Sequence, residues 1–285
     1  SKVDKMSSMI KHRGPDSKGS YVDESIAMSF RRLSIIDLSE MGSQPMKINE
    51  YVITFNGEIY NYRDLRKLLE QNGFNFKSTS DTEVLLNSYI FWGKDMLTMI
   101  KGMFAFAIWD TKKKKLFMAR DHFGKKPFYY SNNGNDFIFC SEIDPIHKTL
   151  DSKSSINQNS LINYLIKGYY NRSKTIYENI LTIDAGEYGV YDFKSNILSI
   201  NKYWKNQFNI TANTTWIILL ISSNGLPPTL MWTRSNSPNI SLPLFTNMLD
   251  NPGAIPTSQR SEQLLILASS EYLIGSSKVN AKSII

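Results

Sequence analysis

Charged residues are distributed very unevenly along this chain of 285 residues, and this division limits where a folded domain can lie. Of the 59 charged residues (33 basic and 26 acidic), only seven lie after Lys205. Six of the ten prolines also lie there, and no regular apolar pattern persists apart from a short stretch at 263–268. Such a segment buries too little apolar surface to offset the entropy of ordering. We predict one domain over residues 1–204, and a tail over residues 205–285 that is not a folded domain and that a shifted reading frame would explain.

The composition is otherwise that of an ordinary globular protein, with 41% apolar and 21% charged residues. The single cysteine, Cys140, rules out an intramolecular disulfide and favours a reducing, cytoplasmic location. The longest apolar run, 216–221, is too short to span a bilayer, and the three histidines are too scattered for a metal site. The net charge of +7 is mild, and the basic run 112–115 is predicted to be a solvated hairpin turn. We expect no nucleic-acid, membrane or metal partner.

Two helices are predicted from their end signals. Asn61 is placed to cap a helix running to Asn72, with Gly73 as its stop. Ser80 and Glu83 have the spacing of a capping box, which opens a second helix.

Strand signals alternate with these helices. MFAFAIWD and KLFMARD are predicted to pair as a hairpin, and FYYSNNGNDFIFCSE is predicted to form another. Because helices and antiparallel strands alternate in blocks, without a βαβ rhythm, the pattern favours α+β layers.

The segment FNGEIYNY, residues 55–62, follows a strand-like run and combines three chemical features. Asn56-Gly57 is typical of a turn, and on local evidence a plain turn is the commoner outcome. Alternatively, the Asn56 amide and the Gly57 N–H are two donors able to converge on an oxyanion. Glu58 adds an anion that suits an ammonium group.

Three other polar positions are ambiguous on their own. HRGPDSKG, residues 12–19, predicts a loop. Arg32 either clamps a carboxylate or pairs with a neighbouring acid. Asp81, early in a predicted helix, either binds a cation or only complements the helix dipole.

Taken in order, seven motifs resemble the glutaminase domain of glutamine-hydrolysing asparagine synthetases. They are HRGPDSKG, FRRLSIIDLSEMGSQPM, ITFNGEIYNYRDLR, TSDTEVLL, GMFAFAIWD, ARDHFGKKPFYY and CSEI. The similarity continues through LIKGYY, KTIYENI and DAGEY to KYW at 202–204, which is about seven-tenths of the chain. That family belongs to the class II glutamine amidotransferases. The resemblance implies a four-layer α/β/β/α sandwich of the N-terminal-nucleophile type, with mostly antiparallel sheets.

The resemblance also implies roles for individual residues. Asn56 and Gly57 correspond to the family's oxyanion hole. Glu58 and Asp81 correspond to the residues that hold the α-ammonium group of L-glutamine, and Arg32 to the one that binds its α-carboxylate. The same pocket is expected to be lined by Leu33, Ile35 and Ile36. We predict that the charged and oxyanion residues converge on one cavity sized for a single amino acid.

The chain departs from the family at the nucleophile, which is an N-terminal cysteine on an inner strand. Only eleven residues precede His12, and none of them is cysteine. Ser1, at the start of a predicted helix, and Cys140, in a predicted strand, are both expected to be structural. We therefore expect a missing inner strand, with an unpaired strand edge or an apolar groove beside it.

A second departure concerns the synthetase half, because no SGGxDS-type pyrophosphate loop follows Trp204. We expect no cofactor in this chain; ATP and Mg²⁺ belong to the family's synthetase domain. Three hypotheses follow: an inactive fragment of an asparagine synthetase, an amidotransferase for a sugar or peptide carboxylate, or a non-catalytic glutamine-binding protein. L-Glutamine is the expected ligand, and the resemblance also implies a homodimer.

Overall fold

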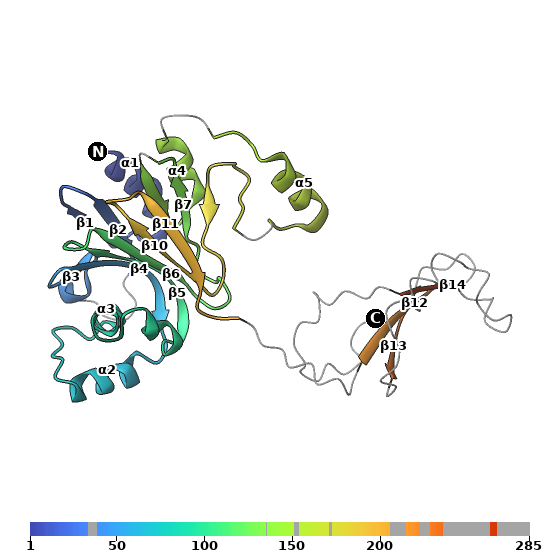
Figure 1. The fold of residues 1–285 in the computed structure, drawn as a ribbon, viewed down its shortest axis with the longest axis horizontal. Helices are drawn as coiled ribbons and strands as arrows, with labels where there is room; N and C mark the ends of the chain where they lie inside the picture. The colour runs from blue at the N-terminus through green and yellow to red at the C-terminus, as the bar shows by residue number, and fades with distance from the viewer. Residues whose placement is uncertain are drawn as a thin grey trace. The chain divides into compact units, whose positions relative to one another are not determined.

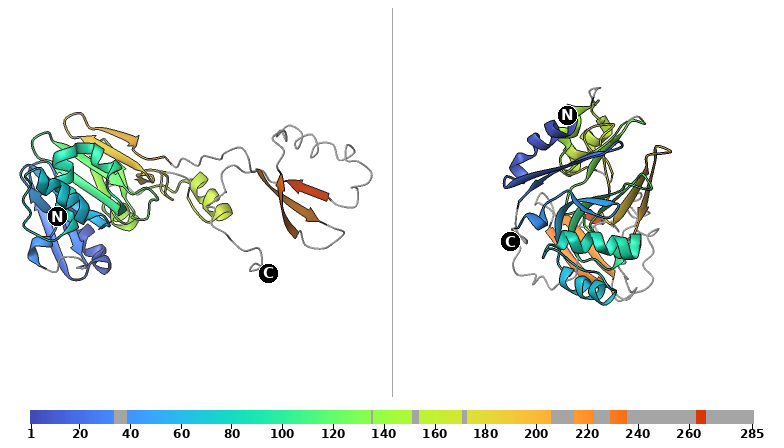
Figure 2. Two further views of the ribbon diagram at one scale, coloured as in Figure 1. Left: turned by 90° about the horizontal axis from the view of Figure 1, so that it is seen from below. Right: turned by 90° about the vertical axis from the view of Figure 1, so that its left-hand side faces the viewer.

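The chain is divided into two units, Ser1–Asn206 and Gln207–Ile285, which are described separately. The computed structural model describes residues 1–33, 39–134, 136–150, 154–170 and 173–205, and the strands at 215–222, 229–235 and 263–266. Figures 1 and 2 show the elements of each unit.

A six-stranded antiparallel sheet forms the centre of the first unit, in the order β11-β10-β6-β5-β4-β3. Its strands are β3 (Met46–Ile48), β4 (Tyr51–Ile59), β5 (Gly102–Asp110), β6 (Lys115–Arg120), β10 (Glu187–Asp192) and β11 (Ile197–Lys202). The β5–β6 hairpin is the one predicted from the sequence, with the basic run in its turn. Alternate side chains of β5 point to opposite faces of the sheet and enter two different apolar cores. Phe104 and Phe106 belong to the core on the first face, and Ala105 and Trp109 belong to the core on the second face. Both faces of this sheet are therefore covered.

The first face is covered by α2 (Tyr62–Gln71) and α3 (Asp81–Trp92), followed by η3 (Gly93–Thr98). Both predicted helices are confirmed, and Ser80 is the N-cap of α3, where its side chain accepts a hydrogen bond from the Thr82 N–H. The contacts of Asn61 and Glu83 differ from the prediction. The Asn61 side chain bonds the Met99 carbonyl and the Lys101 N–H instead of its own helix. The Glu83 carboxylate accepts hydrogen bonds from the backbone of Lys77 and Ser78, not from the N-cap residue. Asn61 thus holds the segment before β5, and Glu83 holds the segment before α3.

The second face is covered by two smaller antiparallel sheets. One is the hairpin of β1 (Ser17–Val22) and β2 (Ala27–Arg32). The other, in the order β8-β7-β9, contains β7 (Tyr129–Asn132), β8 (Phe137–Cys140) and β9 (Leu181–Thr182). An apolar cluster that includes Met28, Trp109 and Tyr130 joins these sheets to the large one. The predicted β7–β8 hairpin is confirmed.

The outermost layer consists of α1 (Lys2–Met9) and α4 (Ile143–Thr149), which pack on β7 and β8 through a third cluster around Met6, Ile146 and Ile180. In Figure 1 these helices lie on the opposite side of the sheets from α2 and α3. Three apolar interfaces therefore separate four layers, and the predicted α/β/β/α arrangement is confirmed. The remaining elements are η1 (Lys11–Arg13), η2 (Glu40–Gly42) and α5 (Gln158–Lys167).

The second unit contains a three-stranded antiparallel sheet in the order β13-β12-β14. Its strands are β12 (Thr215–Ser222), β13 (Thr229–Ser235) and β14 (Gln263–Ile266). That this tail is no independent domain stays a prediction.

None of the helices in the described ranges combines the length and apolar character needed to cross a bilayer. Within the same ranges, no three His, Cys, Asp or Glu side chains lie close enough together to hold a metal ion.

Candidate active site

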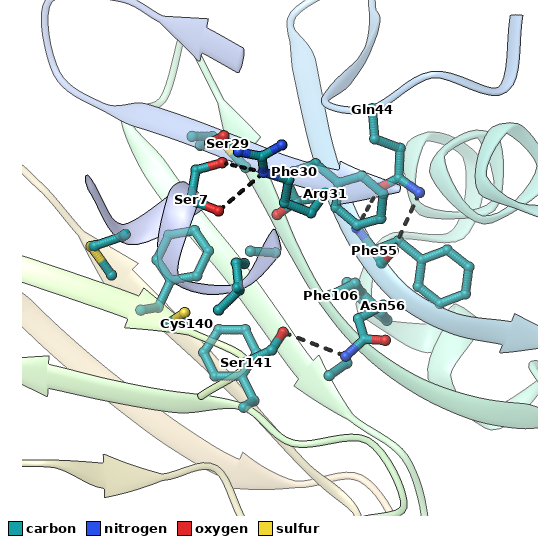
Figure 3. Close-up of a pocket in the computed structure, with 18 of the residues that line it drawn as sticks. Ser7, Ser29, Phe30, Arg31, Gln44, Phe55, Asn56, Phe106, Cys140 and Ser141 are labelled. Atoms are coloured by element: carbon teal, nitrogen blue, oxygen red, sulfur yellow. Dashed lines mark hydrogen bonds between the residues drawn. The ribbon is translucent and has the colours of Figure 1, made fainter. Parts of the chain in front are cut away.

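A cavity of about 880 Å³ opens beside the centre of the large sheet, and its walls come from α1, β2, β4, β5, β8 and the first turn of α3. Figure 3 shows the side chains around it. Its volume is at the upper end for sites that enclose drug-sized ligands, so the prediction of a cavity sized for a single amino acid was wrong. The pairing of β2 and β8, which border the cavity, explains the additional volume. Among the described strands, β2 pairs only with β1, and β8 pairs only with β7. The cavity thus extends between two open sheet edges.

The expected turn at Asn56-Gly57 is absent, because β4 continues through both residues to Ile59. Asn56 pairs with Ala105 and Gly57 with Phe104 of β5. Gly57 has φ +154°, and a Cβ there would lie 2.1 Å from the Met103 carbonyl oxygen and 2.8 Å from the Phe104 Cα atom. Glycine is needed at this position because the neighbouring strand approaches so closely. The turn prediction was wrong, since a distant strand decides the conformation.

Asn56 faces the cavity from β4. Its Nδ2 atom donates a hydrogen bond of 3.4 Å to Oγ of Ser141, the residue that follows β8 (Figure 3). An amide NH₂ group carries two donors, so a second N–H remains for a ligand.

Two carboxylates, Glu58 and Asp81, line the same cavity. Asp81 is only 5% exposed, and its Oδ2 atom accepts a hydrogen bond of 3.0 Å from the Ile59 N–H. Burial raises the pKa of Asp81 to about 6, and the nearby charge of Glu58 also raises it, against the effect of backbone hydrogen bonds. Neither carboxylate has an ion-pair partner among the described residues. An ammonium group placed between them would favour their ionised forms.

Arg32, at the end of β2, is another residue of the cavity wall. Its Nη1 atom donates a hydrogen bond of 2.9 Å to the Ser39 carbonyl, which restrains the guanidinium. Leu33 also borders the cavity and is 55% exposed. Ile35 and Ile36 lie outside the described residues. The five charged and oxyanion residues named from the sequence therefore share one cavity, while their contacts with L-glutamine stay predictions.

The two side chains considered as substitute nucleophiles have other contacts. Ser1 caps α1: its hydroxyl accepts from the Asp4 N–H and donates to the Asp4 carboxylate. Cys140 packs against the Met6–Ile146 cluster, on the α1 and α4 side of β8, and burial raises the pKa of its thiol. A neutral thiol is a poor nucleophile. Both positions fit structural roles.

Two residues of the site were not singled out from the sequence, Gln44 and Ser141. Each lies in a quoted motif, GSQPM or CSEI, but neither spacing nor charge distinguishes it from a loop residue. Only the contacts across the fold identify them.

The comparisons with known proteins identify the family of this chain. The model of the glutamine amidotransferase domain family matches residues 1–204, and the chain belongs to that family. Among its relatives, asparagine synthetase [glutamine-hydrolyzing] 3 of Bacillus subtilis is 39% identical over 71% of this chain and 33% of that protein. Putative asparagine synthetase [glutamine-hydrolyzing] 2 of Methanocaldococcus jannaschii is 36% identical over 71% of this chain and 43% of that protein. The resemblance seen in the motifs is confirmed.

The chain spans a third to less than half of the length of these two relatives. Among solved structures, glutamine phosphoribosylpyrophosphate amidotransferase from B. subtilis aligns with a TM-score of 0.44 and 21% identity, over 63% of this chain and 35% of that chain.

Proposed function

We propose that this chain is the glutamine-binding part of a glutamine-hydrolysing asparagine synthetase. In such an enzyme, ammonia released from the side chain of L-glutamine supplies the ATP-dependent conversion of aspartate to asparagine. The observation that carries the proposal is a single cavity bordered by a guanidinium, two carboxylates and an amide donor. The names of the relatives favour aspartate as the acceptor over a sugar or peptide carboxylate.

Each end of L-glutamine has a chemical complement in the cavity. Arg32 binds the α-carboxylate, and Glu58 with Asp81 binds the α-ammonium group. The scissile amide lies against Asn56 Nδ2 and the Gly57 N–H, which stabilise the oxyanion of the tetrahedral intermediate. Neutral donors of this kind are most effective in a site from which water is excluded.

The nucleophile comes, in this proposal, from an additional strand between β2 and β8. Both strands have an open edge in the described part of the chain, and both border the cavity. Open edges recruit extended segments through backbone hydrogen bonds, and the apolar side chains of Met28, Phe30 and Ile138 offer pockets for alternate residues. Such a strand joins the two small sheets into one layer and ends beside Asn56. An N-terminal cysteine on it supplies both the attacking thiolate and, as its α-amine, the general base.

The chain without that strand is expected to bind L-glutamine weakly and to release no ammonia above background. ATP and Mg²⁺ are expected to act in the part of the relatives that this chain does not cover. A cytoplasmic location and a homodimer also remain part of the proposal.

Ammonia release from L-glutamine tests this function. The chain is compared with a fusion that begins Cys-Gly and continues with the strand-forming N-terminal segment of the B. subtilis relative. The fusion should release ammonia, its Asn56→Ala variant should release ammonia far more slowly, and neither protein should form asparagine. Turnover by the unmodified chain that disappears in Asn56→Ala would reveal a nucleophile already present and refute the proposal.

A further inference from the structure

Gln44 is a buried residue of the cavity wall to which no role has been assigned above, and it is 8% exposed. We propose that Gln44 is a positioning residue that holds the oxyanion strand β4 and the carboxylate-bearing helix α3 in register with each other. The inference rests on the proposed function, since it concerns how the same site keeps its geometry.

Gln44 is linked to β4 through both polar atoms of its side-chain amide. Its Oε1 atom accepts a hydrogen bond of 2.6 Å from the Phe55 N–H, and its Nε2 atom donates one of 3.2 Å to the Phe55 carbonyl (Figure 3). Met46 pairs with Ile53 in an antiparallel ladder. Gln44, two residues before Met46, therefore lies opposite Phe55, two residues after Ile53. Pro45 has no N–H with which to continue the ladder. The side-chain amide of Gln44 therefore replaces a backbone pair, with one donor and one acceptor.

Gln44 is also linked to α3. Nε2 of Gln44 also donates a hydrogen bond of 3.2 Å to Oγ1 of Thr82, the residue after Asp81. Thr82 is itself buried, so this bond forms away from solvent. One amide group thus contacts both the strand that carries the oxyanion donors and the helix that carries an ammonium-binding carboxylate.

Residues 56–58 of β4 lie between two residues whose backbone N–H groups are held by these side chains. Gln44 holds Phe55, immediately before Asn56, and Asp81 holds Ile59, immediately after Glu58, by its hydrogen bond to the Ile59 N–H. Residues 56–58 are those assigned to the oxyanion and the ammonium group. Their separation from α3 is set at both ends.

The backbone of Gln44 is also confined. A Cβ on Gly19 of β1 would lie 1.8 Å from the Gln44 carbonyl oxygen, so β1 passes directly against it. Replacing Gln44 by an apolar residue would leave the Phe55 N–H and carbonyl buried without partners. A purely structural role predicts only a loss of stability, whereas positioning predicts specific changes at Asn56 and Asp81.

The test uses the whole chain and four proteins: wild type, Gln44→Ala, Thr82→Val and Gln71→Ala. Thr82→Val keeps the side-chain volume and removes only the link to α3. Gln71, exposed at the end of α2, is the matched control for loss of a glutamine. NMR reports the Asn56 side-chain amide, the Gly57 N–H and the pKa of Asp81, and calorimetry reports the affinity for L-glutamine.

In Gln44→Ala we expect the Asn56 and Gly57 signals to shift and the pKa of Asp81 to fall from about 6 toward its ordinary value, because solvent reaches a loosened α3. L-Glutamine should bind at least roughly tenfold more weakly, a loss of about 1.4 kcal/mol. Thr82→Val should change the Asp81 titration and leave the Asn56 signals close to wild type. Gln71→Ala should change nothing.

A Gln44→Ala protein that melts earlier but keeps the Asp81 pKa, the Asn56 signals and the glutamine affinity would overturn the inference. If Gln44→Ala does not fold, Thr82→Val decides alone, and an unchanged Asp81 titration rejects the link. If the signals shift as expected but wild type itself binds no L-glutamine, the proposed function fails while the positioning role of Gln44 stands.

Discussion

The Nδ2 atom of Asn56 lies 3.4 Å from Oγ of Ser141, so the proposed oxyanion donor on the large sheet is hydrogen bonded to the end of a strand in a smaller sheet. Because the two residues belong to different layers, the orientation of the Asn56 amide depends on how those layers are stacked. A substitution on either side of this contact therefore tests whether the layers support catalysis.

In the fusion that carries a nucleophile, Asn56→Ala should lower kcat by roughly 10² to 10³-fold, the usual effect of losing one oxyanion donor. Ser141→Ala should lower kcat by less, because the Asn56 amide stays but loses the contact that orients it. Steady-state ammonia release measures both. Ser195→Ala, on an exposed turn, is the control and should be without effect. An unchanged kcat in Asn56→Ala would contradict the assignment.

Asp81→Asn should stabilise the protein at neutral pH while weakening L-glutamine binding. The folded-state pKa of Asp81 is raised to about 6 from 3.8, so its contribution to stability is fully present below about pH 4 and is lost as the pH rises through 6. The loss is about 3 kcal/mol at neutral pH. Removing the charge recovers it, since an asparagine oxygen still accepts from the Ile59 N–H.

Urea unfolding of wild type and Asp81→Asn at pH 4 and pH 7.5 measures this effect. The two proteins should differ at pH 7.5 and be nearly equal at pH 4. Wild-type affinity for L-glutamine should decline as the pH falls through about 6, because the ammonium group needs the ionised carboxylate. A variant less stable than wild type at pH 7.5 would show that the carboxylate is compensated in the folded protein.

Gly57→Ala should destabilise the first unit by roughly 3 kcal/mol or more, at or above the upper end of usual overpacking losses. The added methyl group would lie 2.1 Å from the Met103 carbonyl oxygen, and β4 and β5 must separate to admit it. Gly73→Ala is the matched control, because Gly73 also has positive φ (+85°) but nothing within 4 Å of a Cβ. That control should lose only about 1–2 kcal/mol. Equal losses in chemical denaturation would refute the steric explanation.

Limited proteolysis should remove the second unit early and leave a resistant product ending near Trp204. The charge-poor, proline-interrupted composition of residues 205–285 gives few apolar contacts to protect the backbone. Mass spectrometry of the resistant product identifies its end. A stable fragment covering residues 210–285 would show instead that the second unit folds independently.

Local signals in the sequence were sufficient for the helices and hairpins of the first unit. The α2 and α3 boundaries follow from the residues around Asn61 and Ser80, and the hairpins follow from alternating apolar runs separated by turn residues. The side-chain partners of the caps were not predictable, because Lys101 is forty residues from Asn61. Cap residues identify where a helix begins but not what else they bind.

The candidate site depended on the family resemblance rather than on local chemistry. Nothing within FNGEIYNY distinguishes a turn from a continuous strand; the pairing of Asn56 with Ala105 decides it, and that partner is remote in the sequence. Gln44 was missed for the same reason, since its three hydrogen bonds all reach other segments. A single sequence does not show which residues pair when they are far apart along the chain.

The open edges of β2 and β8 have a consequence for how this chain behaves at high concentration. At the end of β3 the Gln44 side chain already occupies the hydrogen-bonding groups of Phe55, so no foreign strand can add there. Among the described strands, none pairs with the open edges of β2 and β8, and both strands border a space with apolar walls. Extended segments from other molecules compete for that space, because the backbone hydrogen bonds at a strand edge do not depend on the side chains of the added strand. These two edges are therefore places where self-association is expected, and the additional strand proposed above would also block aggregation there.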